Sequence, residues 1–364
     1  MKVKLGDVCD KASSNIRQKD IIDESGNYPI YGAAGKLGLV DFYQQNNSYI
    51  GVVKDGAGIG RTILLPPKSS VIGTMQYLIP KENVLPEYLY YVVKHMHLEK
   101  FQTGATIPHI YFKDYKNVTF DLVPIERQKQ IVEQFSKIER ILQVREQQLS
   151  NLDTLVKARF VEMFGDPIEN CMNFPVYKLE DLCDKLTDGT HSSPESFESG
   201  DYKYITAKNI KVGGFDFSNL TYVTKPVHDS IYSRCNPELG DVLYIKDGVT
   251  TGVAMVNSLN EQFSMLSSVA LLKQNREKID GVYLCGVLNN EHKYDSIRRN
   301  MGGAAITRLT IRKLKNIEVP VAPMEKQREY ADFVQQVDKS KVAIQKSLDE
   351  TQLLFDSLMQ EYFS

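Results

Sequence analysis

The stretch PIERQKQIVEQFSKIERIL, residues 124–142, decides the fold because a related stretch, PMEKQREYADFVQQVDKSK, follows at residues 323–341. Both begin with Pro-x-Glu-x-Gln and continue with large or apolar residues at alternating spacings of three and four. Such spacing is typical of a coiled-coil seam, and the proline and glutamate suit a first helical turn. We therefore predict two long helices in one register, each of about 39 residues and about 58 Å.

The seams of the two predicted helices occupy equivalent positions. The residues expected to form the helix–helix and subunit interface are Ile131, Phe135, Ile138, Leu142, Leu149, Leu152, Val156, Val334, Val337, Ile344, Leu348, Phe355 and Leu358. Arg145 and Arg159 interrupt the first seam at the positions equivalent to Ile344 and Leu358. Neither helix can bury its seam alone, and the linker from Gly165 to Pro175 is short. We therefore expect an antiparallel coiled coil with pseudo-two-fold symmetry.

The chain also repeats outside these helices. Leu5-Gly-Asp-Val-Cys-Asp-Lys11 recurs as Leu179-Glu-Asp-Leu-Cys-Asp-Lys185, Lys54-Asp-Gly-Ala-Gly-Ile-Gly60 as Lys246-Asp-Gly-Val-Thr-Thr-Gly252, and Gly104-Ala-Thr-Ile107 as Gly303-Ala-Ala-Ile306. Because the matches keep their order, we interpret the chain as a tandem duplication of about 175–200 residues. The second copy carries extra residues, which loops tolerate best, so the copies are expected to share a scaffold and differ in their loops.

The globular parts alternate short β-rich runs with Gly and Pro. Strands are predicted at Ser48–Val53, Thr62–Leu65, Gln76–Ile79, Asp241–Ile245 and Val269–Leu272, and helices at Pro86–Gln102 and Val282–Arg299. The expected fold class is α/β (α+β), with two repeated mixed domains and two long helices. The predicted boundaries are 1–123 for the first globular domain, 124–165 for the central helix, 166–322 for the second domain and 323–364 for the C-terminal helix.

Composition limits the classes of function. The 364 residues are 42% hydrophobic, which is enough for real cores, and no apolar run is long enough to span a membrane. The N-terminus lacks an apolar signal region, and the five cysteines lack CxxC spacing, so we expect reduced thiols in a cytoplasmic protein. A net charge of −2 counts against an autonomous DNA binder and fits a subunit whose partners make much of the phosphate contact.

No stretch carries the residues that catalysis requires. The glycine-rich run 56–60 lacks the lysine of a phosphate loop, since Asp55 and Arg61 occupy its key positions. There is no Asn-Pro-Pro-aromatic stretch of the kind that amino-methyltransferases use, and no nuclease pattern of Pro-Asp followed by Glu-x-Lys. The six histidines are scattered, so neither a metal site nor a catalytic residue is expected.

Basic and glycine residues near the repeated motifs are candidates for phosphate or base-edge contact. Lys54 and Lys246 stand beside glycines that let a backbone approach closely, although solvated turn lysines are the alternative interpretation. The candidates are Lys36, Lys54, Gly56, Arg61, Thr106, His109, Lys113, Lys208, Lys246, Gly248, Thr250, Arg308 and Arg312.

Across its whole length the chain resembles the specificity subunits of type I restriction-modification enzymes. The resemblance rests on the repeated order of globular unit and Pro-x-Glu-x-Gln helix, and on Gly104-Ala-Thr-Ile-Pro-His109, Pro124-Ile-Glu-Arg-Gln-Lys-Gln130 and Phe160-x-x-Met-Phe-Gly-Asp-Pro167. It implies two target-recognition domains, each reading half of a bipartite site in double-stranded DNA, joined by spacer helices. It also implies a prokaryotic complex with two methyltransferase (M) subunits and restriction (R) subunits. Those partners would use S-adenosylmethionine, ATP and Mg, so this chain itself is expected to bind no cofactor.

Two other classes of protein remain to be weighed against this resemblance. A coiled-coil scaffold that never touches DNA would suit the mild acidity, whereas two domains with divergent loops on equivalent helices favour DNA reading. A fused methyltransferase-nuclease would need the catalytic motifs that we do not find. A pseudo-two-fold reader would favour half-sites about one helical turn, or about 10 bp, apart.

Overall fold

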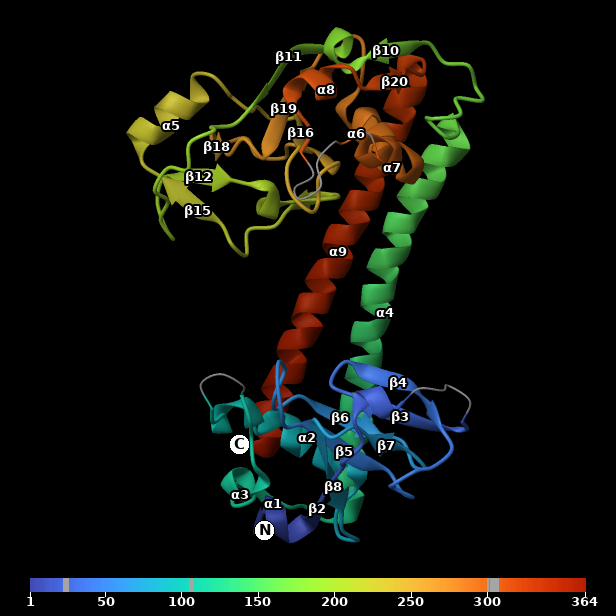
Figure 1. Ribbon diagram of the computed structural model, residues 1–364, viewed down its shortest axis with the longest axis vertical. Helices are drawn as coiled ribbons and strands as arrows, with labels where there is room; N and C mark the ends of the chain where they lie inside the picture. Colours follow the sequence, from blue (N-terminus) through green and yellow to red (C-terminus); the bar gives the residue numbers. More distant parts are fainter. Residues whose placement is uncertain (22–25, 105–107, 300, 302–307) are drawn as a thin grey trace. The chain divides into compact units, whose positions relative to one another are not determined.

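The computed structural model describes residues 1–21, 26–104, 108–299, 301 and 308–364. It divides into two compact units, called here unit 1 (Met1–Gln147 with Gln345–Ser364) and unit 2 (Gln148–Ile344). Two long helices, α4 (Ile125–Phe164) and α9 (Met324–Phe363), each contribute to both units (Figure 1).

Unit 1 is built on a four-stranded antiparallel sheet of order β2–β8–β5–β6. Its strands are β2 (Cys9–Ser13), β5 (Tyr49–Val53), β6 (Thr62–Leu65) and β8 (Met75–Pro80). A smaller sheet has the order β4–β3–β7, and β1 pairs with β9; their bounds are β1 (Lys2–Lys4), β3 (Tyr28–Gly32), β4 (Gly35–Val40), β7 (Ser70–Val71) and β9 (Thr119–Asp121). The shorter helices are α1 (Leu5–Val8), η1 (Gln18–Asp20), α2 (Pro86–His95), η2 (Leu98–Phe101) and α3 (Phe112–Tyr115).

Unit 2 repeats this strand order. Its main sheet is β11–β19–β16–β17, with β11 (Cys183–Asp188), β16 (Val242–Ile245), β17 (Ala254–Val256) and β19 (Val269–Gln274). The second sheet is β15–β12–β18, and β10 pairs with β20; their bounds are β10 (Val176–Lys178), β12 (Tyr202–Ile205), β15 (Thr221–Val223), β18 (Ser264–Met265) and β20 (Glu318–Pro320). Its helices are η3 (Leu179–Leu182), η4 (Ala207–Asn209), α5 (Lys225–Tyr232), α6 (Gly281–Asn289), α7 (Glu291–Arg299) and α8 (Ile311–Lys315). The equivalent pairings confirm the tandem duplication.

The extra residues of the second copy form elements of their own. The hairpin of β13 (Ile210–Lys211) and β14 (Gly214–Phe215) stands where unit 1 has only the tight β3–β4 turn. Helix α5 stands between β15 and β16, where the described chain of unit 1 passes from β4 to β5 without a helix. The predicted difference between the copies therefore lies outside the shared sheets.

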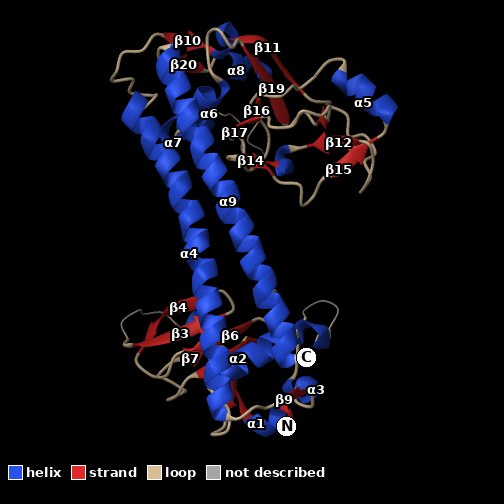
Figure 2. Ribbon diagram, turned by 180° about the vertical axis from the view of Figure 1, so that it is seen from behind, coloured by secondary structure: helices blue, strands red, loops and turns tan. Residues whose placement is uncertain are grey.

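The central strand of each main sheet is buried on both faces. In β5, Ile50 and Val52 enter the core beneath α2, while Tyr49 and Val53 enter a second core toward the smaller sheet. Strand β16 alternates in the same way between two cores. A strand buried on both faces needs a continuous apolar run, which both sequences have. Figure 2 shows the resulting layers in unit 2, where α6 and the β12–β15 pair lie on opposite sides of the main sheet.

Within each unit, α4 and α9 pack antiparallel, as expected. In unit 1 the Phe135 and Phe355 rings lie 5.2 Å apart, and Phe135 also stacks with Phe363. In unit 2 the Phe160 and Tyr330 rings lie 5.5 Å apart. The side chains named above as the seam are all buried or half-buried. Arg159, which interrupts the apolar seam, pairs with Glu329 of α9 at 3.0 Å instead.

The glutamine of the repeated Pro-x-Glu-x-Gln motif joins each long helix to its globular domain. Gln128 is fully buried; its Oε1 accepts a hydrogen bond from the amide of Leu85 at the start of α2, and its Nε2 donates to the carbonyls of Asn83 and Val123. Gln327 is buried in the same way and bonds the amide of Asp280, before α6, and the carbonyl of Ala322. This motif therefore supplies buried backbone groups with partners in both copies.

The two shorter helix predictions were wrong in one respect. The stretch Pro86–Gln102 breaks at His97, whose φ of +49° is left-handed and ends the helical path. The stretch Val282–Arg299 breaks at Asn290, whose ψ of 135° separates α6 from α7. Neither break is marked by Gly or Pro, so residue types alone gave no stop signal. The first long helix does end as predicted, with Gly165 in the left-handed region directly after Phe164.

Candidate nucleic-acid interface

The repeated Lys-Asp-Gly motif forms a tight turn directly after the central strand of each sheet. In unit 1 the turn of Lys54, Asp55 and Gly56 follows β5, and Gly56 has a φ of +86°. Further along the turn, a Cβ at Gly60 would lie 2.5 Å from the amide nitrogen of Glu99. Glycine is therefore required at this point by contact as well as by conformation.

A second segment fastens this turn in unit 1. The amide of Gly56 donates to the carbonyl of Pro108 at 3.1 Å, and the amide of Ile110 donates to the carbonyl of Lys54 at 3.0 Å. His109 Nδ1 lies 2.6 Å from Asp55 Oδ1. The structure thus brings Lys54, Gly56 and His109 together, although they are far apart in the sequence.

Unit 2 builds the same arrangement from equivalent residues. The amide of Leu309 donates to the carbonyl of Lys246 at 2.8 Å, and Arg308 Nε lies 3.3 Å from Asp247 Oδ1. Arg308 therefore stands where unit 1 has His109. Gly248 has a φ of +104°, which suits the same turn.

The two motif lysines differ sharply in exposure. The Lys54 side chain is 24% exposed and its Nζ lies 3.8 Å from Asp55 Oδ2. The Lys246 side chain is only 2% exposed, with Nζ 3.1 Å from Asp247 and 3.4 Å from Asp188. This burial argues against the direct phosphate or base-edge contact that the repeat predicted for Lys246, because its ammonium group is already enclosed by carboxylates.

The other candidates are placed as follows. Arg61 is exposed and donates to the carbonyl of Ala33 at 2.9 Å, which brings it to the β3–β4 hairpin that carries the exposed Lys36. Lys113 lies over the ring of Tyr111 at 5.3 Å. In unit 2, exposed positions are taken by Lys208 in η4, Thr250 in the second turn and Arg312 in α8. Thr106 lies outside the described residues.

Sequence reasoning missed several residues that touch these turns. Tyr111 is half exposed and its ring stacks near that of His109 at 6.3 Å, which places an aromatic ring beside the first turn. Arg298 of α7 donates to the carbonyls of Val249 and Thr251 and so holds the second turn. Only the nearness of Tyr111 to His109 in the sequence could have drawn attention to it. Nothing in the sequence pairs Arg298 with a turn nearly 50 residues earlier.

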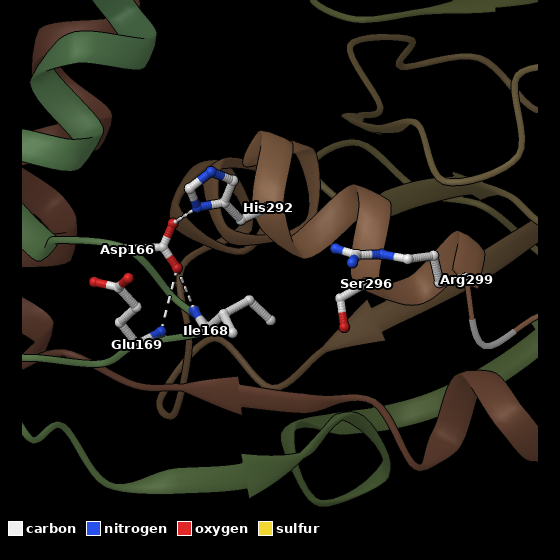
Figure 3. Close-up of a pocket in the computed structure, with 6 residues that line it drawn as sticks. All are labelled: Asp166, Ile168, Glu169, His292, Ser296 and Arg299. Atoms are coloured by element: carbon white, nitrogen blue, oxygen red, sulfur yellow. Dashed lines mark hydrogen bonds and ion pairs between the residues drawn. The ribbon is translucent and has the colours of Figure 1, made fainter.

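A pocket of about 390 Å³ in unit 2 lies where α4 ends (Figure 3). Asp166 accepts hydrogen bonds from the amides of Ile168 and Glu169 and lies 2.5 Å from Nδ1 of His292 on α7. Desolvation alone would raise the pKa of Asp166, but these hydrogen bonds outweigh it and hold the pKa below its ordinary value. The hydrogen bonds of the Asp166 carboxylate are already made within the protein. We therefore interpret this site as a structural contact that joins the end of α4 to α7.

The described residues include no cluster of three or more His, Cys, Asp or Glu side chains able to hold a metal ion. The repeat-related Cys9 and Cys183 are free thiols, and burial raises the pKa of each to about 12. Neither is a thiolate near neutral pH. Among the helices described, none is long and apolar enough to cross a membrane.

Comparison with known proteins identifies the class. The family model of the type I restriction modification DNA specificity domain matches residues 1–153 and again residues 172–351. Since the two matches cover most of the sequence, the chain belongs to this family, as the resemblance predicted. The paired matches agree with the two equivalent sets of sheets.

Relatives and solved structures agree with this assignment. The specificity subunit of the type I restriction enzyme MjaVIII from Methanocaldococcus jannaschii is 23% identical over an aligned length of 316, and the match covers 80% of this chain and 73% of that protein. The type I restriction-modification S subunit from M. genitalium has a TM-score of 0.62 at 18% identity, covering 100% of this chain and 96% of its own. A chain solved in a study of complex assembly and conformational transition in a type I system has a TM-score of 0.57 at 16% identity, covering 100% and 97%. These two structures share the fold.

Proposed function

We propose that this chain reads DNA for a type I restriction-modification enzyme and performs no catalytic step itself. Residues 1–123 and 166–322 serve as target-recognition domains, each for one half of a bipartite site, and residues 124–165 and 323–364 form the spacer helices. One observation carries the proposal. The same glycine turn, paired to an equivalent basic segment, is built twice, while the hairpin and helix inserted around it occur in unit 2 alone among the described residues. A shared scaffold with different surroundings suits the reading of two different half-sites.

In this proposal two M subunits dock on the spacer helices and recognition domains, and R subunits join that core. Exposed apolar side chains on the long helices support a protein partner there; they include Ile141, Val144, Leu155, Val342 and Leu353. S-adenosylmethionine, ATP and Mg would be bound by those partners. The net charge of −2 is consistent with shared phosphate contact.

Deleting the gene for this chain should abolish adenine methylation at one bipartite sequence, because the M subunits would lose their reader. Methylation mapping by long-read sequencing in cells with and without the gene measures this effect and identifies the site. Restoring the gene on a plasmid is the control. An unchanged methylation pattern would instead favour the scaffold that does not touch DNA.

Replacing Lys54 with Ala in the assembled complex should weaken binding to the mapped site by about 1–3 kcal/mol if the ammonium group meets a base edge. A phosphate contact would give a uniform loss on all sequences and a smaller salt dependence. Fluorescence anisotropy at several salt concentrations separates the two cases. Lys129→Ala, which removes an exposed lysine of α4, is the matched control. Equal binding by both variants would show that the first Lys-Asp-Gly motif is only a turn.

A further inference from the structure

Unit 2 contains a row of alternating charges that runs through the second Lys-Asp-Gly turn. Lys246 Nζ lies between Asp188 Oδ2 at 3.4 Å and Asp247 Oδ2 at 3.1 Å. Arg234 pairs with the outer oxygen of Asp188 at 3.2 Å, and Arg308 pairs with Asp247 at 3.3 Å. The row therefore reads arginine, aspartate, lysine, aspartate, arginine, and its net charge is positive.

Burial changes regularly along this row. Lys246 and Asp188 are 2% and 5% exposed, whereas the two terminal arginines, Arg234 and Arg308, are 49% and 54% exposed. The two carboxylates of Asp188 and Asp247 would repel each other where little solvent reaches them. The enclosed ammonium group of Lys246 compensates their negative charges. The arginines hold the carboxylates from outside and keep half of their surface open to a ligand.

Arg234 is also fixed in orientation. Its Nη1 binds Asp188, and its Nη2 donates to the carbonyl of Gly189. A planar guanidinium group that is anchored on one side presents its free donors in a defined direction, which suits bidentate recognition of a phosphate.

Unit 1 lacks two neighbouring members of this row, the carboxylate of Asp188 and the guanidinium of Arg234. The strand registers place Ser13 where unit 2 has Asp188, because β11 has a bulge between Cys183 and Lys185 and β2 has none, so among the described residues no second carboxylate encloses Lys54. Arg234 directly follows the α5 region, whose helix has no counterpart in the described chain of unit 1. Lys54 accordingly stays partly exposed, and the carboxylate that pairs with it in the described part of the chain is that of Asp55, at 3.8 Å.

We infer that the repeated lysines have different roles, a conclusion that rests on the DNA-reading function proposed above. Lys54 contacts DNA directly in unit 1. Lys246 is a positioning residue that keeps Asp188 and Asp247 together, and Arg234 and Arg308 carry the phosphate contacts of unit 2. The inserted segment of unit 2 therefore supplies a DNA contact that the shared scaffold alone does not have.

The test compares salt dependence with half-site discrimination in the assembled complex. The probes are a duplex with the mapped site and duplexes with either half-site scrambled. Lys54→Met and Arg234→Gln should each lower the slope of log Kd against log salt by about 1. Lys246→Met should leave that slope unchanged. It should lower the ratio of affinities for the mapped duplex and the duplex with the unit 2 half-site scrambled by on the order of tenfold. Adding Asp188→Asn to Lys246→Met should restore part of this discrimination, because it removes a buried negative charge that Lys246 no longer neutralises.

Two results would overturn the inference. A slope lowered by about 1 in Lys246→Met would make Lys246 a phosphate contact, and an unchanged slope in Arg234→Gln would remove Arg234 from the interface. If Lys246→Met does not fold by circular dichroism, Asp188→Ser gives unit 2 the residue of unit 1. In Asp188→Ser this slope should rise by about 1, because Lys246 becomes available for a phosphate contact. A slope equal to that of wild type, or lower, would contradict the inference that enclosure by Asp188 keeps Lys246 from contacting DNA. Failure of the proposed function looks different, because the wild-type complex itself would not distinguish the mapped duplex from the scrambled ones.

Discussion

Replacing Gln128 or Gln327 with Leu is expected to lower the free energy of unfolding by about 2–5 kcal/mol. Each side chain satisfies two or three buried backbone groups, and each group left without a partner costs about 1–3 kcal/mol. The loss is large beside a total stability of about 5–15 kcal/mol. Urea denaturation followed by circular dichroism measures it.

The control for this prediction lies on the same helix. Gln143→Leu changes an exposed position of α4 and should stay within about 0.5 kcal/mol of wild type. If Gln128→Leu behaved like Gln143→Leu, the repetition of the motif in both copies would have no structural explanation in these hydrogen bonds.

Inserting seven residues after Leu142 in α4 alone should destabilise the helix pair and abolish site-specific methylation. An insertion of one heptad keeps the seam on the same face of α4. It moves the seam residues after the insertion along the helix, so that they no longer lie opposite their partners on α9. The contact of Phe135 with Phe355 places Leu348 across from Leu142, one heptad along each helix. A matching insertion at Leu348 should therefore restore the packing.

The double insertion also tests whether the helices set the spacer. It lengthens both helices by about 10 Å, which corresponds to about three base pairs of DNA. Methylation mapping should then show both half-sequences with a longer spacer, or no methylation if the new spacing leaves the same face of the DNA. A changed half-sequence with an unchanged spacer would mean that the helices read sequence and the domains do not.

Most of the fold could be predicted because it rests on periodicity and repetition. The spacing of the seam residues from Ile131 to Val156 is enough to predict their helix. Continuous apolar runs are enough to predict the strands β5 and β16. The break at His97 could not be predicted, because a left-handed histidine has no distinctive neighbours in the sequence.

The candidate site was predictable only in part. Identical Lys-Asp-Gly motifs suggested identical roles, but exposure depends on what packs above each lysine. Asp188 on β11 encloses Lys246, whereas Ser13 at the equivalent position of β2 leaves Lys54 partly exposed. A single side chain more than 50 residues away therefore changes the exposure of a repeated residue, and no local sequence pattern indicates this.

The composition of unit 1 has a consequence for biosynthesis. Its core includes Phe355, Met359 and Phe363, which follow unit 2 in the chain, together with residues that precede unit 2. Unit 2 is continuous from 148 to 344 and can close its own core while translation is still under way. The core of unit 1 is complete only when this part of α9 has been synthesised, so residues made before unit 2 reach their folded environment after it. During that interval Phe135 and its neighbours are uncovered, and this is when the nascent chain most needs protection from aggregation.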